Sequence, residues 1–126
     1  MRRAIAFIAL FIGLDYGITA FFIYTKDWFY ETNPLLNELF TSAGLSLGVT
    51  IAFVGALTIK SGLLYAIHQL LAIKFRTDTR IFSQLLATST LVLSASHIYA
   101  VPYNLVLGIY RCQLPNPYDT GIPILV

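Results

Sequence analysis

The stretch AIAFIALFIGLDYGITAFFIY, residues 4–24, contains a single charged side chain, Asp15. About 20 apolar residues in an α-helix are enough to cross the hydrocarbon core of a bilayer. Arg2 and Arg3 precede the stretch, as basic residues precede a secretory signal peptide. Asp15 interrupts the apolar run, however, and the residues after it make a poor cleavage site. We therefore expect a retained transmembrane helix over about 4–24.

The rest of the chain shares this apolar character. Its 126 residues are 57% hydrophobic and 11% charged, whereas soluble domains carry about 25% charged residues. A chain of one-domain length cannot bury so much apolar surface in a core, so the surplus must face lipid or other proteins. The net charge of +2 is too small and too scattered for a nucleic-acid partner. The single Cys112 is expected to be a free thiol, with a bridge between subunits as the alternative.

Two further apolar stretches complete the predicted fold, which is all-α with three transmembrane helices in residues 1–111. The second span covers about 45–75 and the third about 81–110, where Pro102 should kink the helix. A polar interruption at 60–62 divides the second span. Because the part of this span after residue 62 is too short to cross a bilayer alone, we expect one long or broken helix over 45–75.

A short interfacial helix is expected after the first span, over about 34–41. Asn33 can cap its start, and Pro34 suits the first helical position. Small residues follow at a spacing that permits close packing of helices. The predicted packing positions are Gly44, Gly48 and Gly55.

The basic residues determine the expected orientation, because cytoplasmic loops carry an excess of Lys and Arg. In the three-span arrangement, one side of the membrane receives Arg2, Arg3, Lys74, Arg76 and Arg80. The other side receives Lys26 and Arg111. We therefore expect a multi-pass protein of the plasma membrane, with a cytoplasmic N-terminus and an extracytoplasmic tail over 112–126.

Three ionisable side chains, Asp15, Lys60 and His97, lie in the middle parts of the predicted spans. At about 1.5 Å of rise per residue, Asp15 lies roughly 18 Å above the basic residues that precede its span. Lys60 lies roughly 21–24 Å above the basic residues that follow its span, and His97 lies roughly 25 Å above Arg80. These depths agree within about one helical turn, so the three side chains can meet.

A lone charge at the centre of a bilayer costs about 2.5–3.5 kcal/mol on insertion scales. We therefore expect an ion pair between Asp15 and Lys60, with Thr19 one turn above Asp15 and His97 joining from the third span. The cluster either clasps the helices in register or forms part of a proton or ion path. We expect no metal there, because a few dispersed ligands are not a metal signature.

A second polar group is expected near the outer surface, where Glu31 and Asn33 precede the second span and Asn104 lies late in the third. These side chains can hydrogen-bond one another. We expect them to clamp the loop, and a ligand site is the alternative.

The order of these motifs resembles an uncharacterised family of small prokaryotic membrane proteins, frequent in archaea. The resemblance consists of D-x-x-x-T at 15–19, E-x-N-P at 31–34, Lys60 inside the second span and Asn104 late in the third. It covers most of residues 10–110. It implies three spans and draws attention to these polar residues, but it implies no activity, cofactor or substrate.

The sequence contains no motif of a catalytic serine, zinc site, thiol pair or phosphate loop, so we expect neither enzyme activity nor a cofactor. Small size and little mass outside the membrane favour an accessory or structural subunit of a larger membrane complex. The analogy is to respiratory complexes and to membrane monooxygenases of the ammonia or methane type, which carry such small subunits. The alternative is an oligomeric carrier of protons, ions or small solutes that uses Asp15, Lys60 and His97. The expected partners are other membrane subunits and lipid, and a homo-oligomer is the other arrangement to consider.

Overall fold

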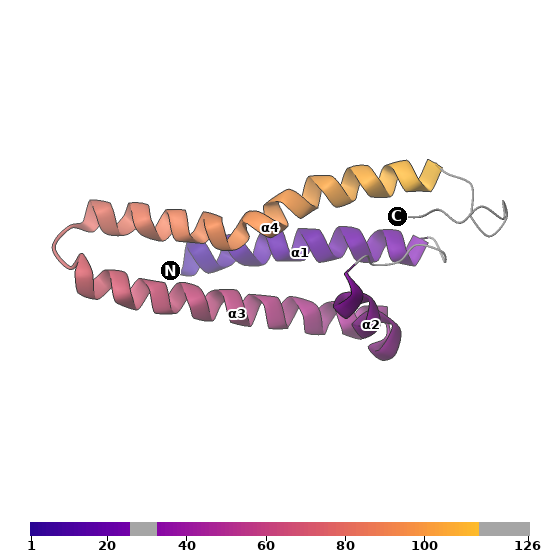
Figure 1. Cartoon of the computed structure of the whole chain (residues 1–126), viewed down its shortest axis with the longest axis horizontal. Helices are drawn as coiled ribbons and strands as arrows, with labels where there is room; N and C mark the ends of the chain where they lie inside the picture. Colours follow the sequence, from indigo (N-terminus) through magenta and orange to yellow (C-terminus); the bar gives the residue numbers. More distant parts are fainter. Residues whose placement is uncertain (26–32, 114–126) are drawn as a thin grey trace.

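A computed structural model describes residues 1–25 and 33–113, and these contain four helices and no strand. The helices are α1 (Arg2–Thr25), α2 (Pro34–Ala43), α3 (Leu45–Lys74) and α4 (Thr79–Gln113). Figure 1 shows α1, α3 and α4 lying side by side, with the short α2 at one end of the bundle. All three long helices are long and apolar enough to cross a membrane, so the predicted all-α architecture is confirmed at this level.

The helix ends differ from the predicted ones by at most three residues. The second predicted span is one unbroken helix through 60–62, because an apolar helix tolerates a single glycine at a cost of only about 1 kcal/mol. Pro102 lies inside α4, and Figure 1 shows this helix bending about halfway along its length. The predicted tail begins inside α4, whose last residue is Gln113, and its remainder lies outside the described residues.

Local sequence explains how α2 begins and how it passes into α3. The Asn33 side chain accepts a hydrogen bond from the Leu35 amide at 3.1 Å, and Pro34 occupies the first turn. Gly44 then joins the two helices with a φ of +81°, a conformation that L side chains rarely adopt. The predicted cap of α2 is therefore present.

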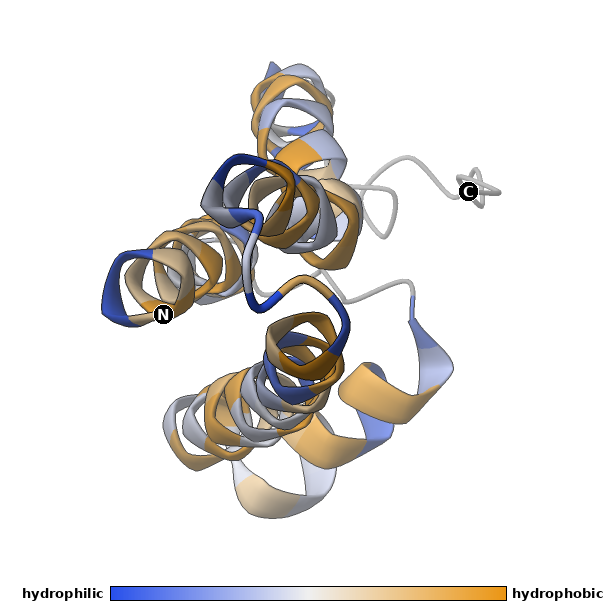
Figure 2. Ribbon diagram, turned by 90° about the vertical axis from the view of Figure 1, so that its left-hand side faces the viewer, coloured by the Kyte–Doolittle hydropathy of each residue, from blue (hydrophilic) through white to orange (hydrophobic). Residues whose placement is uncertain are grey.

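The turn between α3 and α4 lies at the opposite end of the bundle. There the Asp78 carboxylate accepts a hydrogen bond from the Ile81 amide at 3.0 Å and so caps the start of α4. Figure 2, viewed from this end, shows hydrophilic residues at the start of α1 and in this turn. The helix surfaces between the two ends are largely hydrophobic, and large apolar side chains such as Val54, Ile59 and Val92 are exposed on them.

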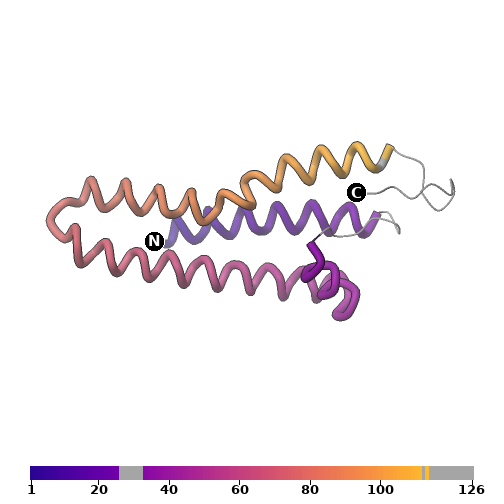
Figure 3. Tube along the Cα trace, in the orientation of Figure 1, coloured from indigo at the N-terminus to yellow at the C-terminus, as the bar shows by residue number. Residues whose placement is uncertain are grey.

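The apolar core lies where all three long helices meet. Ile8 and Ile12 of α1 and Leu64 of α3 are fully buried, and Leu93 of α4 packs against them. Figure 3 shows that α1 and α4 run in the same direction, while α3 runs the opposite way. The chain therefore forms a three-helix bundle, with each long helix in contact with the other two.

The three predicted packing glycines have three different environments. A Cβ at Gly48 would meet the Phe40 ring at 2.8 Å, so this glycine lets α2 pack closely on α3. Gly44 forms the bend between them, and a Cβ at Gly55 would meet nothing within 4 Å. Gly108, which the sequence analysis did not single out, permits the closest approach, because the Phe22 ring lies directly against it.

Candidate functional site

The centre of the site is a buried pair formed by Asp15 of α1 and His97 of α4. The Asp15 Oδ2 and His97 Nδ1 atoms are 2.7 Å apart, and the two residues are 7% and 8% exposed. The Tyr16 ring meets the imidazole edge-on at a centroid distance of 5.6 Å. An ionised carboxylate can only accept, so His97 Nδ1 carries the proton of this hydrogen bond.

Asn104 supplies the second donor to the same carboxylate. Its Nδ2 group donates to Asp15 Oδ1 at 2.7 Å and to Thr19 Oγ1 at 3.3 Å. Asn104 follows His97 by two helical turns and therefore lies on the same face of α4. Helical side chains lean toward the N-terminus of their helix, which brings the Asn104 amide down to Asp15.

Lys60 of α3 does not join this pair directly. Its Nζ donates to the Leu93 carbonyl oxygen and, at 3.1 Å, to the Ser96 hydroxyl of α4. Among the described residues Lys60 has no carboxylate within 4.0 Å, so the predicted Asp15–Lys60 ion pair is wrong. The side chain instead reaches α4 one residue before His97, which keeps Lys60 at the level of the Asp15 pair.

A cavity of about 270 Å³ opens beside the pair and joins the two polar groups predicted from the sequence. Its walls come from α1, α2 and α4. They consist of Asp15, Tyr16, Thr19, Asn33, Leu36, Ser96, His97, Ala100 and Asn104. Asn33 thus both caps α2 and lines the cavity. Glu31, the third member of the predicted outer clamp, lies outside the described residues.

The hydrogen bonds give the histidine a defined chemical state. With Nδ1–H donated to Asp15, a neutral imidazole keeps a lone pair on Nε2, and no hydrogen bond to that nitrogen is present within the described part of the chain. The arrangement can therefore accept a proton or a hydrogen bond at Nε2.

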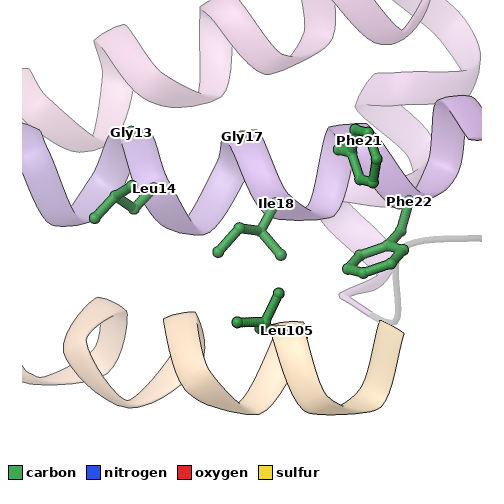
Figure 4. A pocket seen from close by; sticks show the side chains of 7 residues that line it. All are labelled: Gly13, Leu14, Gly17, Ile18, Phe21, Phe22 and Leu105. Atoms are coloured by element: carbon green, nitrogen blue, oxygen red, sulfur yellow. The ribbon is translucent and has the colours of Figure 1, made fainter. Parts of the chain in front are cut away.

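Two other hollows among the described residues are apolar and differ in character from this cavity. Figure 4 shows one of about 250 Å³ between α1 and α4, where Ile18 and Leu105 face each other. The second histidine, His68, packs edge-on against Phe82 instead of facing a polar space. In the described ranges, no group of three or more His, Cys, Asp or Glu side chains is placed to hold a metal ion.

Several members of the site were not predicted from the sequence. Tyr16, Leu36 and Ser96 carry no motif, and Asn104 was expected near the surface instead of beside Asp15. The seven-residue spacing of His97 and Asn104 was the available signal, because it places both on one helix face.

These features define an all-α protein with three helices of membrane-spanning length and a buried Asp–His–Asn cluster. Comparisons with protein-family models, with curated proteins and with solved structures found no match to this chain. Any function must therefore be argued from the residues themselves.

Proposed function

We propose that this chain is a small multi-pass membrane protein and acts as a subunit of a larger membrane assembly. In the proposed orientation the N-terminus and the α3–α4 turn face the cytoplasm. The concentration of Arg and Lys at that end of the bundle supports it. The observation that carries the proposal of an assembly is the environment of Lys60.

Lys60 lies midway along α3, at the depth where lipid offers no hydrogen-bond acceptor. Its ammonium group has three donors, of which two are used by the Leu93 carbonyl and the exposed Ser96 hydroxyl. In the described part of the chain the third donor has no acceptor. A half-buried cation of this kind is costly in a bilayer and favours contact with another polar group.

The partner expected at Lys60 is a transmembrane helix with an aspartate or glutamate near its centre. Among the described residues, a second copy of this chain is a poor source of that carboxylate. Its Asp15 is buried and already bonded, and its Glu38 and Asp78 lie near the ends of the bundle. A different membrane protein therefore satisfies the charge better than a homo-oligomer does.

Purification from native membranes in a mild detergent tests this proposal. We expect a membrane protein to co-purify with the wild-type chain and to be lost with Lys60→Gln. Lys74→Gln is the matched control, because it removes the same charge from the exposed end of α3. Restoration of the complex by Lys60→Asp together with an acidic-to-lysine change in the partner would identify the contact. A chain that always elutes as a 14.0 kDa protomer without a partner contradicts the proposal.

A carrier is the second function that the polar cluster supports, and it requires a path between copies of the chain. Ile8, Ile12 and Leu64 fill the bundle on the cytoplasmic side of the proposed orientation and leave no polar path there among the described residues. Flux in proteoliposomes tests this candidate. If Asp15→Asn leaves the flux unchanged, the cluster has no role in transport.

A further inference from the structure

The cavity beside Asp15 and His97 has a polar wall and extends as far as α2. Asn33, which caps α2, and Leu36 of α2 line it together with Thr19 and Asn104. α2 is short and lies at the end of the bundle. Water that enters the cavity from this end can approach the His97 ring, which forms part of the cavity wall.

The opposite side of the pair is closed by apolar packing. Ile12 lies one turn from Asp15 along α1, and Leu93 lies one turn from His97 along α4. Both belong to the core in which Ile12 and Leu64 have no exposed surface. The Ser94 hydroxyl is buried at this level and has no hydrogen-bond partner among the described residues, while Ile8 and Leu64, which have no exposed surface, continue the apolar packing beyond it. One hydroxyl gives water too few polar partners to enter this layer, since a buried water makes about three hydrogen bonds.

The charges of the described residues around His97 balance when its ring is neutral. From α1 it faces the Asp15 carboxylate and the Tyr16 side chain, and from α3 the Lys60 ammonium approaches the adjacent Ser96. Asn33 and Leu36, the described wall residues at α2, are uncharged. Within residues 1–25 and 33–113, one negative and one positive group therefore lie around a neutral imidazole whose Nε2 makes no hydrogen bond.

We infer that the Asp15–His97 pair is a binding site for one exchangeable proton, loaded only from the α2 end of the bundle. The proton comes from water in the cavity and forms an N–H bond at His97 Nε2, leaving hydroxide or a deprotonated buffer behind. The ring becomes imidazolium, while Asp15 stays ionised and accepts from Nδ1–H in both states. This inference goes beyond the proposed membrane subunit and stands whether or not a partner binds at Lys60.

Nitrogen-15 NMR of the labelled full chain in lipid nanodiscs tests proton binding directly. His68→Gln removes the only other histidine signal and so assigns His97. We expect the neutral ring to carry its proton on Nδ1 and to gain a second proton on Nε2 when the sample is acidified. A ring that keeps one protonation state until the protein unfolds overturns the inference.

Removal of the carboxylate tests the role of Asp15 in the same experiment. In Asp15→Asn we expect the second proton on His97 to be absent under conditions in which the wild-type ring is doubly protonated, because the carboxylate that offsets the imidazolium charge has been removed. Glu38→Gln is the matched control, since Glu38 lies exposed on α2 and does not line the cavity. An equal loss of the second proton in both variants contradicts a direct action of Asp15.

Access is tested with a small, charged thiol reagent that cannot cross membranes, in a Cys112→Ser background. Ala100→Cys places a thiol in the cavity wall, and Ala56→Cys places one beside the apolar core. We expect the thiol at position 100 to react from the α2 side only and the thiol at 56 to react from neither side. Reaction at position 100 from the opposite side overturns one-sided loading, even if His97 titrates.

Discussion

The hydrogen bond between Asn104 and Asp15 offers a quantitative test of the buried cluster. Asn104→Ala removes a donor 2.7 Å from Asp15 Oδ1 and 3.3 Å from Thr19 Oγ1. A hydrogen bond to a charged group contributes about 1.5–3 kcal/mol in water-soluble proteins. In membrane proteins, side-chain hydrogen bonds between helices average about 0.6 and reach about 1.7 kcal/mol. One strong and one weak bond therefore predict a loss of about 1–2 kcal/mol in the free energy of unfolding.

The loss can be measured by reversible unfolding in mixed detergent micelles, with helix content followed by circular dichroism. Asn37→Ala is the matched control, because the Asn37 side chain makes no hydrogen bond in the described part of the chain. Asn37 is only half-buried, and a substitution that breaks no hydrogen bond there should change stability by less than about 0.5 kcal/mol.

A double-mutant cycle with Asp15→Ala then isolates the contact itself. Directly bonded partners show coupling energies of about 0.5–3 kcal/mol, whereas distant sites are additive. If Asp15→Ala and Asn104→Ala prove additive within about 0.3 kcal/mol, the two side chains do not interact as described.

Three further predictions concern glycines, and unfolding in micelles measures all of them. Gly44→Ala should cost about 1–2 kcal/mol, because an L residue is strained at a φ of +81°; an unchanged stability would refute the bend. Gly48→Ala should destabilise the contact of α2 with α3, whereas Gly55→Ala, with open space around it, should gain about 0.5–1 kcal/mol from helix propensity. Equal effects at 48 and 55 would contradict this difference. Gly108→Ala should push α4 away from α1, and Phe22→Leu should restore most of the loss; a loss that persists in the double variant would refute the proposed clash.

The helices were predictable from the sequence because their signals are local. Span length follows from the number of consecutive apolar residues, and the start of α2 follows from the Asn33–Pro34 cap. The continuity of α3 was left open, because Lys60 beside Ser61 and Gly62 suits both a break and a polar site inside a helix. The contacts of Lys60 with α4 favour a polar site inside a continuous helix, because they satisfy part of its hydrogen-bonding capacity without breaking α3.

The partners of the polar side chains were only partly predictable, because helix rise fixes depth but not rotation about the helix axis. The common level of Asp15, Lys60 and His97 follows from counting residues along each span. Which neighbour each side chain meets depends on the face that its helix presents. Lys60 turns toward α4, and Asn104 leans back from its expected outer level to reach Asp15.

We expect the two proposed sites to be coupled through one turn of α4. Lys60 bonds to Ser96, and the adjacent His97 bonds to Asp15, so the two sites use neighbouring residues of α4. A partner carboxylate at Lys60 would cancel the positive field at that ring and favour protonation of Nε2. By thermodynamic reciprocity, protonation of His97 would then strengthen partner binding by the same factor. The affinity of the chain for a partner with an acidic helix at Lys60 should therefore rise when the pH on the α2 side is lowered. Asp15→Asn should weaken that dependence on pH.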